Sequence, residues 1–380
     1  MLSSGTGRRP AASAAASAPR KSTRARAPRH VARAGWFGGL GGGGGKSNTA
    51  AAPPSSQQAT DLSQQLSPLP ASHDQAIRQA QLATERAMKD GLRLLEVEVP
   101  PVAITAVAGD GDGQAEMNAS LKLLRQLLGA SVFRDRAPRV RIMFGDPSEL
   151  AVATRGATLD PAAGRAQTDA TFPRGGVSVS GQPEFAVGYL TRPNALWSLT
   201  GVNFDRWSPC VQVRDEDEVV VISSPCFNAK EELKAARQIW EEKCGSGGGS
   251  AQQQGTAASQ TEKTMIVFNG ELEKLREGYY PPMFFRELAA INQEWLPRME
   301  TVYSVRNFRG SRPGALVKSY PSKWTLYRRD PYGEAEDGED DASLAVPVWS
   351  GERRPSLKEV ALELLPKSDA AMAEALRKRR

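Results

Sequence analysis

The sequence predicts an α/β domain with a mixed, largely parallel sheet, flanked by helices and ending in an antiparallel C-terminal edge. Short apolar runs rich in Val, Ile and Phe alternate with longer segments in which apolar residues recur every three or four positions. That alternation is typical of strands joined by crossover helices, which makes neighbouring strands parallel. The last three apolar runs follow one another too closely for helices to lie between them, which favours antiparallel pairing there.

The predicted strands are short apolar runs, most of them bounded by Gly, Pro, Asp or Asn. They lie at 92–99, 139–145, 218–223, 264–268, 301–308, 315–320 and 323–328, with one or two more within 177–190. The predicted helices cover 74–90 and the region around 117–128, and others begin near 147, 229, 284 and 357. Apolar side chains at helical spacing define them.

Three of these helices begin with a Ser or Asn that is followed three residues later by Gln or Glu. This capping-box pattern satisfies backbone N–H groups that the first turn leaves without partners. The pairs are Ser72 with Gln75, Asn228 with Glu231, and Ser356 with Glu359.

The composition divides the chain into five parts. We expect a plastid transit peptide at 1–34, a disordered Gly/Ser/Pro-rich linker at 35–70 and a single α/β domain at 71–330. The domain contains a flexible Gly/Ser/Gln-rich insert at 245–263. An acidic loop at 331–345 and a C-terminal helical extension at 346–380 follow.

The first 60 residues contain nine Lys or Arg and no Asp or Glu. An acid-poor start rich in Arg, Ser and Ala is typical of an organelle transit peptide. A mitochondrial address and a nucleic-acid-binding arm are the alternatives. Cleavage after Ala34 would remove eight of these cations and no acid, which takes the formal net charge from +6 to −2. The basic character of the whole chain therefore reports the import signal, and nucleic acid is not an expected partner.

The stretch GGLGGGGGKSN at 38–48 resembles a phosphate-binding loop. The P-loop pattern requires a glycine five positions before Gly45, and Leu40 stands there. No strand-like run precedes the stretch, and Pro53 and Pro54 oppose a helix after it. We interpret it as a flexible glycine tract.

Cys and His are scarce. The three cysteines form no CxxC pair, and the two histidines cannot supply a His-based metal site. This scarcity argues against zinc enzymes and His-dependent hydrolases and leaves carboxylate, Lys or Tyr chemistry open. We predict no metal, no cofactor and no recognisable catalytic set, and between an enzyme and a non-enzyme, which the sequence does not decide, we favour the non-enzyme. No apolar stretch is long enough to span a bilayer, so any membrane contact is expected to be peripheral.

Polar residues follow three of the predicted strands. Asp146, Ser223 and the pair Asn269-Gly270 stand at or just after these strand ends. Ligands of open α/β sheets bind outside the carboxyl ends of the strands, so these residues are the candidate ligand-binding set. Ordinary turn and helix-cap chemistry is the alternative, because Asp, Ser and Asn are preferred capping residues.

Aromatic and basic residues are interleaved at 307–329. Tyr320, Pro321, Lys323 and Trp324 are the candidate partner-binding surface within this segment. Aromatic rings beside cations can also stack on single-stranded RNA, so RNA binding is one functional hypothesis for this segment. The other interpretation is an edge hairpin with its aromatic side chains in the core.

Several short motifs, taken in order, resemble a plastid and cyanobacterial domain of unknown function that occurs in photosystem II assembly proteins of the Low PSII Accumulation type. The motifs are LEVEVPP (95–101), RVRIMFGD (139–146), NGEL (269–272), ETVY (300–303) and GAL (314–316) followed by Tyr320-Pro321 and Trp324. The resemblance covers roughly 73–329 and supplies no catalytic residue.

This resemblance implies a chloroplast protein, in the stroma or peripheral to the thylakoid, that assists photosystem II assembly or accumulation. Its expected partner is a photosystem II subunit or a thylakoid insertion or assembly factor. The alternative is a domain that binds a small ligand or phosphate and has an unidentified enzymatic activity.

Overall fold

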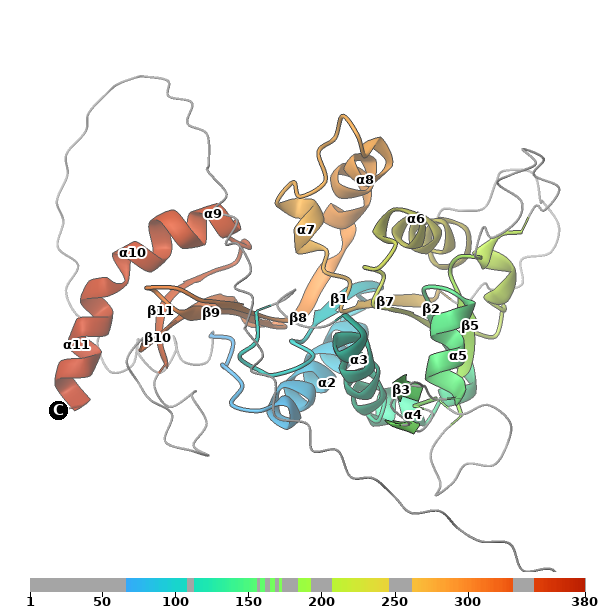
Figure 1. Cartoon of the computed structure of the whole chain (residues 1–380), viewed down its shortest axis with the longest axis horizontal. Helices are drawn as coiled ribbons and strands as arrows, with labels where there is room; N and C mark the ends of the chain where they lie inside the picture. Colours follow the sequence, from blue (N-terminus) through green and yellow to red (C-terminus); the bar gives the residue numbers. More distant parts are fainter. Residues whose placement is uncertain are drawn as a thin grey trace, which may run out of the picture. The chain divides into compact units, whose positions relative to one another are not determined.

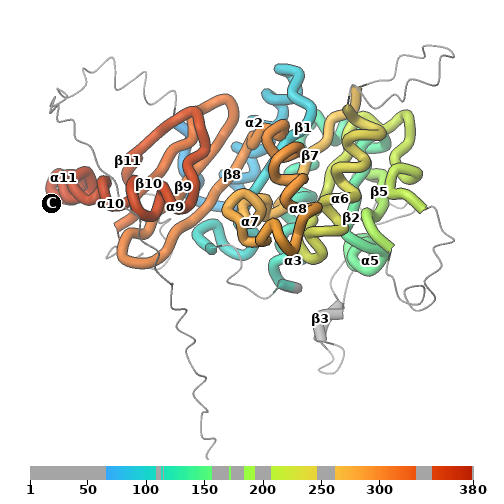
Figure 2. Tube along the Cα trace, turned by 90° about the horizontal axis from the view of Figure 1, so that it is seen from above, coloured from blue at the N-terminus to red at the C-terminus, as the bar shows by residue number. Residues whose placement is uncertain are grey.

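A nine-stranded mixed sheet is the centre of the fold (Figure 1), as the sequence predicts. Its order is β11-β10-β9-β8-β1-β7-β6-β2-β5. Figure 2 labels these strands, except β6, from β11 at one end to β5 at the other. The strands are β1 (Leu94–Glu98), β2 (Val140–Phe144), β5 (Ala186–Tyr189), β6 (Val219–Ser223), β7 (Thr264–Phe268), β8 (Glu300–Phe308), β9 (Gly314–Ser319), β10 (Trp324–Arg329) and β11 (Ala345–Gly351). A separate two-stranded ribbon joins β3 (Thr158–Asp160) to β4 (Arg165–Gln167).

The computed structural model describes most of the chain after residue 65. The described residues are 66–107, 113–155, 158–160, 165–167, 171–172, 184–192, 207–245, 262–330 and 345–379. The predicted transit peptide, the glycine tract, nearly all of the predicted insert and nearly all of the acidic loop lie outside them.

The parallel part of the sheet runs from β8 to β5. β2, β6 and β7 are buried along their whole length, and their sequences VRIMF, VVVIS and TMIVF are apolar with few interruptions. Continuous apolar runs of this kind are expected where helices cover both faces of a sheet. β-branched side chains also favour the extended backbone.

Helices cover the two faces of this parallel part (Figure 1). On one face lie α2 (His73–Lys89), α3 (Gly113–Leu127), α4 (Ser131–Arg134) and α5 (Pro147–Arg155). On the other lie α6 (Ala229–Ile239), α7 (Glu273–Arg276) and α8 (Arg286–Ala290). Successive residues of a strand point to opposite faces, so Leu95 and Val97 pack under the first group and Leu94 under the second.

The antiparallel edge consists of β8 to β11. β11 lies within the segment that the sequence predicts as a helical extension, so the sheet continues beyond residue 330. The C-terminal helices α9 (Leu357–Glu359), α10 (Leu365–Lys367) and α11 (Asp369–Arg379) follow it. Val360 and Leu365 pack on Leu316, Trp324 and Leu326 in a small cluster of their own.

Order begins before the predicted domain boundary at residue 71. Ser67 is buried, its N–H donates to Thr325 Oγ1 at 2.9 Å, and its hydroxyl donates to the Lys323 carbonyl at 2.7 Å. Tyr327 donates its hydroxyl proton to the Ser67 carbonyl at 2.8 Å. The end of the predicted linker is therefore tied to the antiparallel edge.

Two of the three predicted caps form through the side chain named in the pattern. The Ser72 hydroxyl accepts from Gln75 N–H, and the Ser356 hydroxyl accepts from Glu359 N–H. Asn228 makes no such bond; its own N–H instead donates to the Glu232 carboxylate at 3.0 Å. The described residues include no helix with the length and apolar character needed to cross a bilayer.

Candidate functional site

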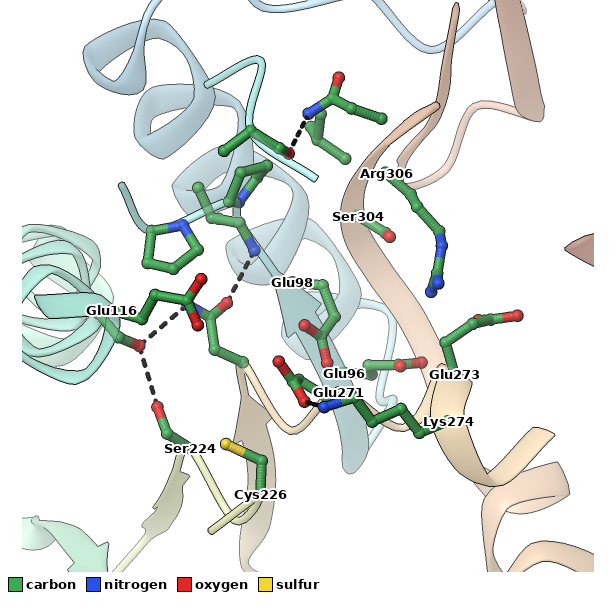
Figure 3. Close-up of a pocket in the computed structure, with 18 of the residues that line it drawn as sticks. Glu96, Glu98, Glu116, Ser224, Cys226, Glu271, Glu273, Lys274, Ser304 and Arg306 are labelled. Atoms are coloured by element: carbon green, nitrogen blue, oxygen red, sulfur yellow. Dashed lines mark hydrogen bonds and ion pairs between the residues drawn. The ribbon is translucent and has the colours of Figure 1, made fainter. Parts of the chain in front are cut away.

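A pocket lies at the carboxyl ends of β1, β6 and β7 and beside β8 (Figure 3). Its cavity volume is about 260 Å³. After β1 the chain continues into α3 on one face of the sheet, and after the neighbouring strand β7 it continues into α7 on the other. Connections that diverge in this way leave a crevice between the two strand ends, which is the usual ligand position in an open α/β sheet.

Three residues of the pocket wall hold an unfavourable backbone conformation. Ser224, Asn269 and Glu271 have φ of 45°, 48° and 49°, and among the described residues they are the non-glycine positions with positive φ. The left-handed region is costly for residues with a Cβ, and such residues concentrate at ligand and active sites. Their concentration in one pocket marks it as the candidate functional site.

Asn269 fixes the floor of the pocket through both ends of its amide. Its Oδ1 accepts from Val99 N–H at 2.8 Å, and its Nδ2 donates to the Ser120 hydroxyl at 2.9 Å. That hydroxyl lies 2.9 Å from the Ser224 hydroxyl. The chain of bonds joins the ends of β1, β6 and β7 to α3, and it stabilises the strained residues.

Glu96 anchors the charged side of the site. It is fully buried, and Arg276 donates to both of its carboxylate oxygens, at 2.7 and 2.8 Å. Arg354, from the segment after β11, approaches Glu96 at 3.7 Å and pairs with Glu273. Burial alone would raise the pKa of Glu96, but the charges of Arg276 and Arg354 outweigh it and lower that pKa to about 2.

Glu98 follows on the same face of β1 and has the opposite character. Its Oε1 is buried with no hydrogen-bond partner. Burial, followed by the negative charges of Glu96 and Glu271, raises the pKa of Glu98 to about 8. Two glutamates two residues apart therefore differ in protonation near neutral pH, Glu96 being ionised and Glu98 largely neutral.

Arg306 enters the pocket from β8. Glu98 pairs with Ser304 in the strand register, and Arg306 lies two residues further along the same face. Figure 3 shows Glu98 and Arg306 directed into the same space, with no dashed line joining them. The described residues supply neither a hydrogen bond nor an ion pair for the Arg306 guanidinium.

The opposite wall is apolar. It is formed by Val99, Pro100, Pro101, Met117 and Phe227. Phe227 is 53% exposed, so its ring stands at the entrance. The pocket thus joins a charged half to an apolar half, which is the usual composition of a site for a small organic ligand.

The pocket does not hold an activated nucleophile. Burial, with the negative charges of Glu271 and Glu232, raises the pKa of the Cys226 thiol, so the thiol stays protonated. Across the described residues no group of three His, Cys, Asp or Glu side chains is arranged to hold a metal ion. The charged and hydrogen-bonding side chains of the lining are suited to binding polar groups.

The sequence-predicted ligand set is brought only partly together. β7, β6 and β2 are neighbours, so the strand ends do converge. Asn269 lines the pocket and Gly270 follows it, but Ser223 is buried within β6 and its neighbour Ser224 faces the cavity. Asp146 lies outside the lining, where its carboxylate accepts from the N–H groups of Ser148 and Glu149 at the start of α5.

The candidate partner surface at 320–324 is mostly engaged within the fold. Trp324 is 4% exposed and lies under the guanidinium of Arg354, 4.9 Å from the ring centroid. Tyr320 donates to Asp90 at 3.1 Å, and Lys323 lies 3.4 Å from Glu352. Pro321 is exposed. A partner or an RNA base could not reach the Trp324 ring in this arrangement.

Sequence reasoning missed Glu98, Arg306 and Arg354. A signal for the first was present, because LEVEV places two acids at alternate positions of an apolar strand, on one face. No comparable signal marks Arg354, which reaches the pocket from a segment more than 250 residues away along the chain. Its role depends entirely on the position of β11.

A second feature is an exposed apolar loop between α7 and α8, at 279–285. Tyr279, Met283 and Phe284 are 70%, 74% and 76% exposed. Tyr280 and Phe285 anchor the loop, with ring centroids 5.3 Å apart and both rings against the core. The Pro281 carbonyl accepts from the N–H groups of Phe284 and Phe285. The sequence places Phe284 on the core face of a helix, but the helix begins two residues later.

The family model for a domain of unknown function, DUF1995, matches residues 70–362. The chain belongs to the DUF1995 family. The match includes β11 and the first C-terminal helix, in agreement with a sheet that continues beyond residue 330. No curated protein and no solved structure matches this DUF1995 chain.

Proposed function

We propose that this DUF1995 protein is a chloroplast auxiliary factor that assists photosystem II assembly or accumulation through protein–protein contacts rather than through catalysis. The expected partner is a photosystem II subunit or a thylakoid insertion or assembly factor. Contact takes place in the stroma or at the thylakoid surface. The exposed loop at 279–285 is the observation that carries this proposal.

The loop has the properties of a protein-binding element. Three large apolar side chains, Tyr279, Met283 and Phe284, stand together in solvent, and aromatic residues and Met are enriched in the centres of protein interfaces. The ring contacts of Tyr280 and Phe285 hold the loop in place, so little conformational entropy is lost on binding. The acid-free, Arg-rich start of the chain supports a plastid address.

The test is complementation of a plastid line that lacks the protein. The chain with Tyr279→Ser, Met283→Ser and Phe284→Ser should fold but fail to restore photosystem II levels, measured by immunoblot of its core subunits and by chlorophyll fluorescence. A matched control replaces three exposed apolar residues elsewhere, Leu82, Val211 and Leu362, with Ser.

The control should restore photosystem II as the unaltered chain does. Normal photosystem II levels in the line that lacks the protein would overturn the proposal. If the loop variant restored photosystem II fully, the loop at 279–285 would not be the partner-binding element.

A second candidate function is the binding of a small ligand or phosphate, with an unidentified enzymatic activity. The unpaired Glu98 and Arg306 in a cavity of about 260 Å³ favour it. A thermal-shift screen of amino acids, nucleotides and phosphates tests it, because a ligand at about 100 times its Kd adds about 2.7 kcal/mol of stability. A flat screen would count against any ligand function.

A further inference from the structure

We propose that the pocket binds a small zwitterion, with an ammonium group at Glu98, a carboxylate or phosphate group at Arg306, and an apolar body against the wall formed by Pro101, Met117 and Phe227. This inference rests on the second candidate function, ligand binding, and adds the chemical class of the ligand. It is independent of partner binding by the loop at 279–285.

The first step is the pattern of ion pairs around the cavity. Most charged groups of the lining neutralise one another: Glu96 and Glu273 contact Arg354, and Glu271 contacts Lys274. Glu98 and Arg306 are the two lining groups that neither an ion pair nor a hydrogen bond engages among the described residues. A partly desolvated charge without a partner is costly, so each of these two groups favours a ligand group of opposite charge.

The second step is their placement. Glu98 ends β1 and Arg306 lies on the adjacent strand β8, two residues beyond the position opposite Glu98. Both residues line the cavity, and their side chains are directed toward the same space (Figure 3). When Glu98 is ionised the two groups have opposite charge, so a ligand that pairs with both must itself carry both charges.

The third step concerns the end of the ligand at Glu98. The carboxylates of Glu96 and Glu271 lie near Glu98, and their negative charges disfavour its ionised form. The charges of Arg354 and Arg276 offset this effect only in part. An ammonium group adds a positive charge beside Glu98 and donates the hydrogen bond that Glu98 Oε1 does not receive from the chain. The described residues place no metal-binding group here, so an organic cation fits better than a metal ion.

The fourth step concerns the other end. Burial disfavours the charged form of Arg306 and lowers its pKa, against the negative charges of Glu98, Glu277 and Glu271, which favour that form. An arginine stays charged at neutral pH. A guanidinium presents parallel N–H donors that match a carboxylate or phosphate group. The apolar wall opposite accepts the remainder of the ligand without a polar partner.

The experiment titrates the purified chain with matched probes by calorimetry. Phenylalanine and O-phosphoethanolamine carry both charges, 3-phenylpropionate carries only the carboxylate, and phenethylamine carries only the amine. At least one zwitterion should bind about tenfold or more tighter than the singly charged probes, because each charge-assisted hydrogen bond contributes at least that factor. The two zwitterions distinguish a carboxylate ligand from a phosphate ligand.

Variants assign each end of the probe. Arg306→Gln should abolish the preference for phenylalanine over phenethylamine, and Glu98→Gln should abolish its preference over 3-phenylpropionate. The matched controls, Arg78→Gln and Glu85→Gln on α2, should change neither preference. Circular dichroism confirms that each variant is folded.

The outcomes separate the two levels of the proposal. Equal affinity for zwitterions and singly charged probes, or preferences that survive Glu98→Gln and Arg306→Gln, overturn the zwitterion inference while ligand binding stands. The absence of binding by any zwitterion, together with a flat screen, overturns both. The absence of zwitterion binding with a positive screen overturns the inference alone.

Discussion

Glu96 and Glu98 show how strongly the environment of a single residue decides its charge. Both lie on the same face of β1, two residues apart. Arg276 and Arg354 hold Glu96 in its ionised form, whereas burial and neighbouring carboxylates disfavour ionisation of Glu98. Ion pairs therefore offset the cost of burying the carboxylate of Glu96, whereas no ion pair among the described residues offsets it at Glu98.

The raised pKa of Glu98 predicts that the difference in unfolding free energy between the unaltered chain and Glu98→Gln depends on pH. Its folded-state pKa of about 8 lies above its ordinary value of 4.5, so the unfolded chain loses this proton first as pH rises. Glu98 therefore destabilises the fold progressively between about pH 4.5 and pH 8, by about 1–3 kcal/mol in total. Glu98→Gln removes that penalty, and its stability relative to the unaltered chain should increase over this window.

Urea unfolding of the two chains at several pH values measures this difference. Glu149 and Glu232 also have a pKa raised to about 7, but both chains contain them and their effect cancels. A stability difference that does not change with pH would show that Glu98 is solvated like an ordinary glutamate.

The ion pair between Glu96 and Arg276 predicts strong non-additivity. Arg276→Met leaves the buried carboxylate of Glu96 with Arg354 and the Thr301 hydroxyl, and should cost about 2–4 kcal/mol of unfolding free energy. Adding Glu96→Gln removes the unpaired charge, and the double variant should lie within about 1 kcal/mol of the unaltered chain. Chemical denaturation of the four chains measures this cycle. Additive losses would mean that the pair is not coupled.

At this scale the sequence predicts part of the site. Asn269 was a candidate because it follows a predicted strand of an α/β sheet, and it lies in the lining of the pocket. Ser223, a second candidate at a strand end, is buried within β6, and the next residue, Ser224, lines the pocket. Asp146 also follows a predicted strand, but its carboxylate caps the start of α5. Only the structure distinguishes a helix cap from a residue of the pocket lining.

At the scale of elements, the strands of the parallel part were predictable and the last strand was not. β2, β6 and β7 are continuous apolar runs, and their boundaries agree with the sequence to within one residue. β11 contains Pro347, which removes a backbone donor and argues against a strand. An edge strand tolerates it because, within the part of the chain that the structure describes, one side of β11 has no partner strand.

The C-terminal helices predict a sharp contrast between two leucines three residues apart. Leu365 is 4% exposed and packs in the cluster with Leu316, Trp324 and Leu326, whereas Leu362 is 65% exposed. Leu365→Ala should cost about 2–3 kcal/mol through the cavity that it leaves, and Leu362→Ala about 0.5 kcal/mol or less. Thermal unfolding compares the two. Equal effects would mean that these helices do not pack on the sheet as described.

At the scale of the molecule, the pocket depends on strand order, which local patterns cannot reveal. β1 lies between β7 and β8 although these strands are about 170 and 200 residues further along the chain. Helical and strand periodicity reports which residues are buried, but not which strands are neighbours. The sequence therefore predicts that ligands bind at strand ends, whereas the position of the pocket between β1 and β7 had to come from the structure.

The whole pocket also predicts how ligand affinity depends on pH. An ammonium group binds the ionised form of Glu98. Burial, and then the negative charges of Glu96 and Glu271, raise the pKa of Glu98 to about 8, although the charges of Arg354 and Arg276 act in the opposite direction. Below about pH 8, binding of a zwitterion must release this proton, so affinity should rise with pH, approaching about tenfold per unit, and level off near pH 8.

Two kinds of charged group that face Glu98 keep their charge in this range. The arginines stay charged, and the pKa of Glu96 is lowered to about 2. Calorimetry with phenylalanine in buffers of different ionisation enthalpy should therefore register one released proton near pH 7. Glu98→Gln should bind with an affinity that does not change between about pH 6 and pH 8, and without proton release. Proton release that persists in this variant would place the titrating group elsewhere, with Glu149 and Glu232 as the next groups to replace.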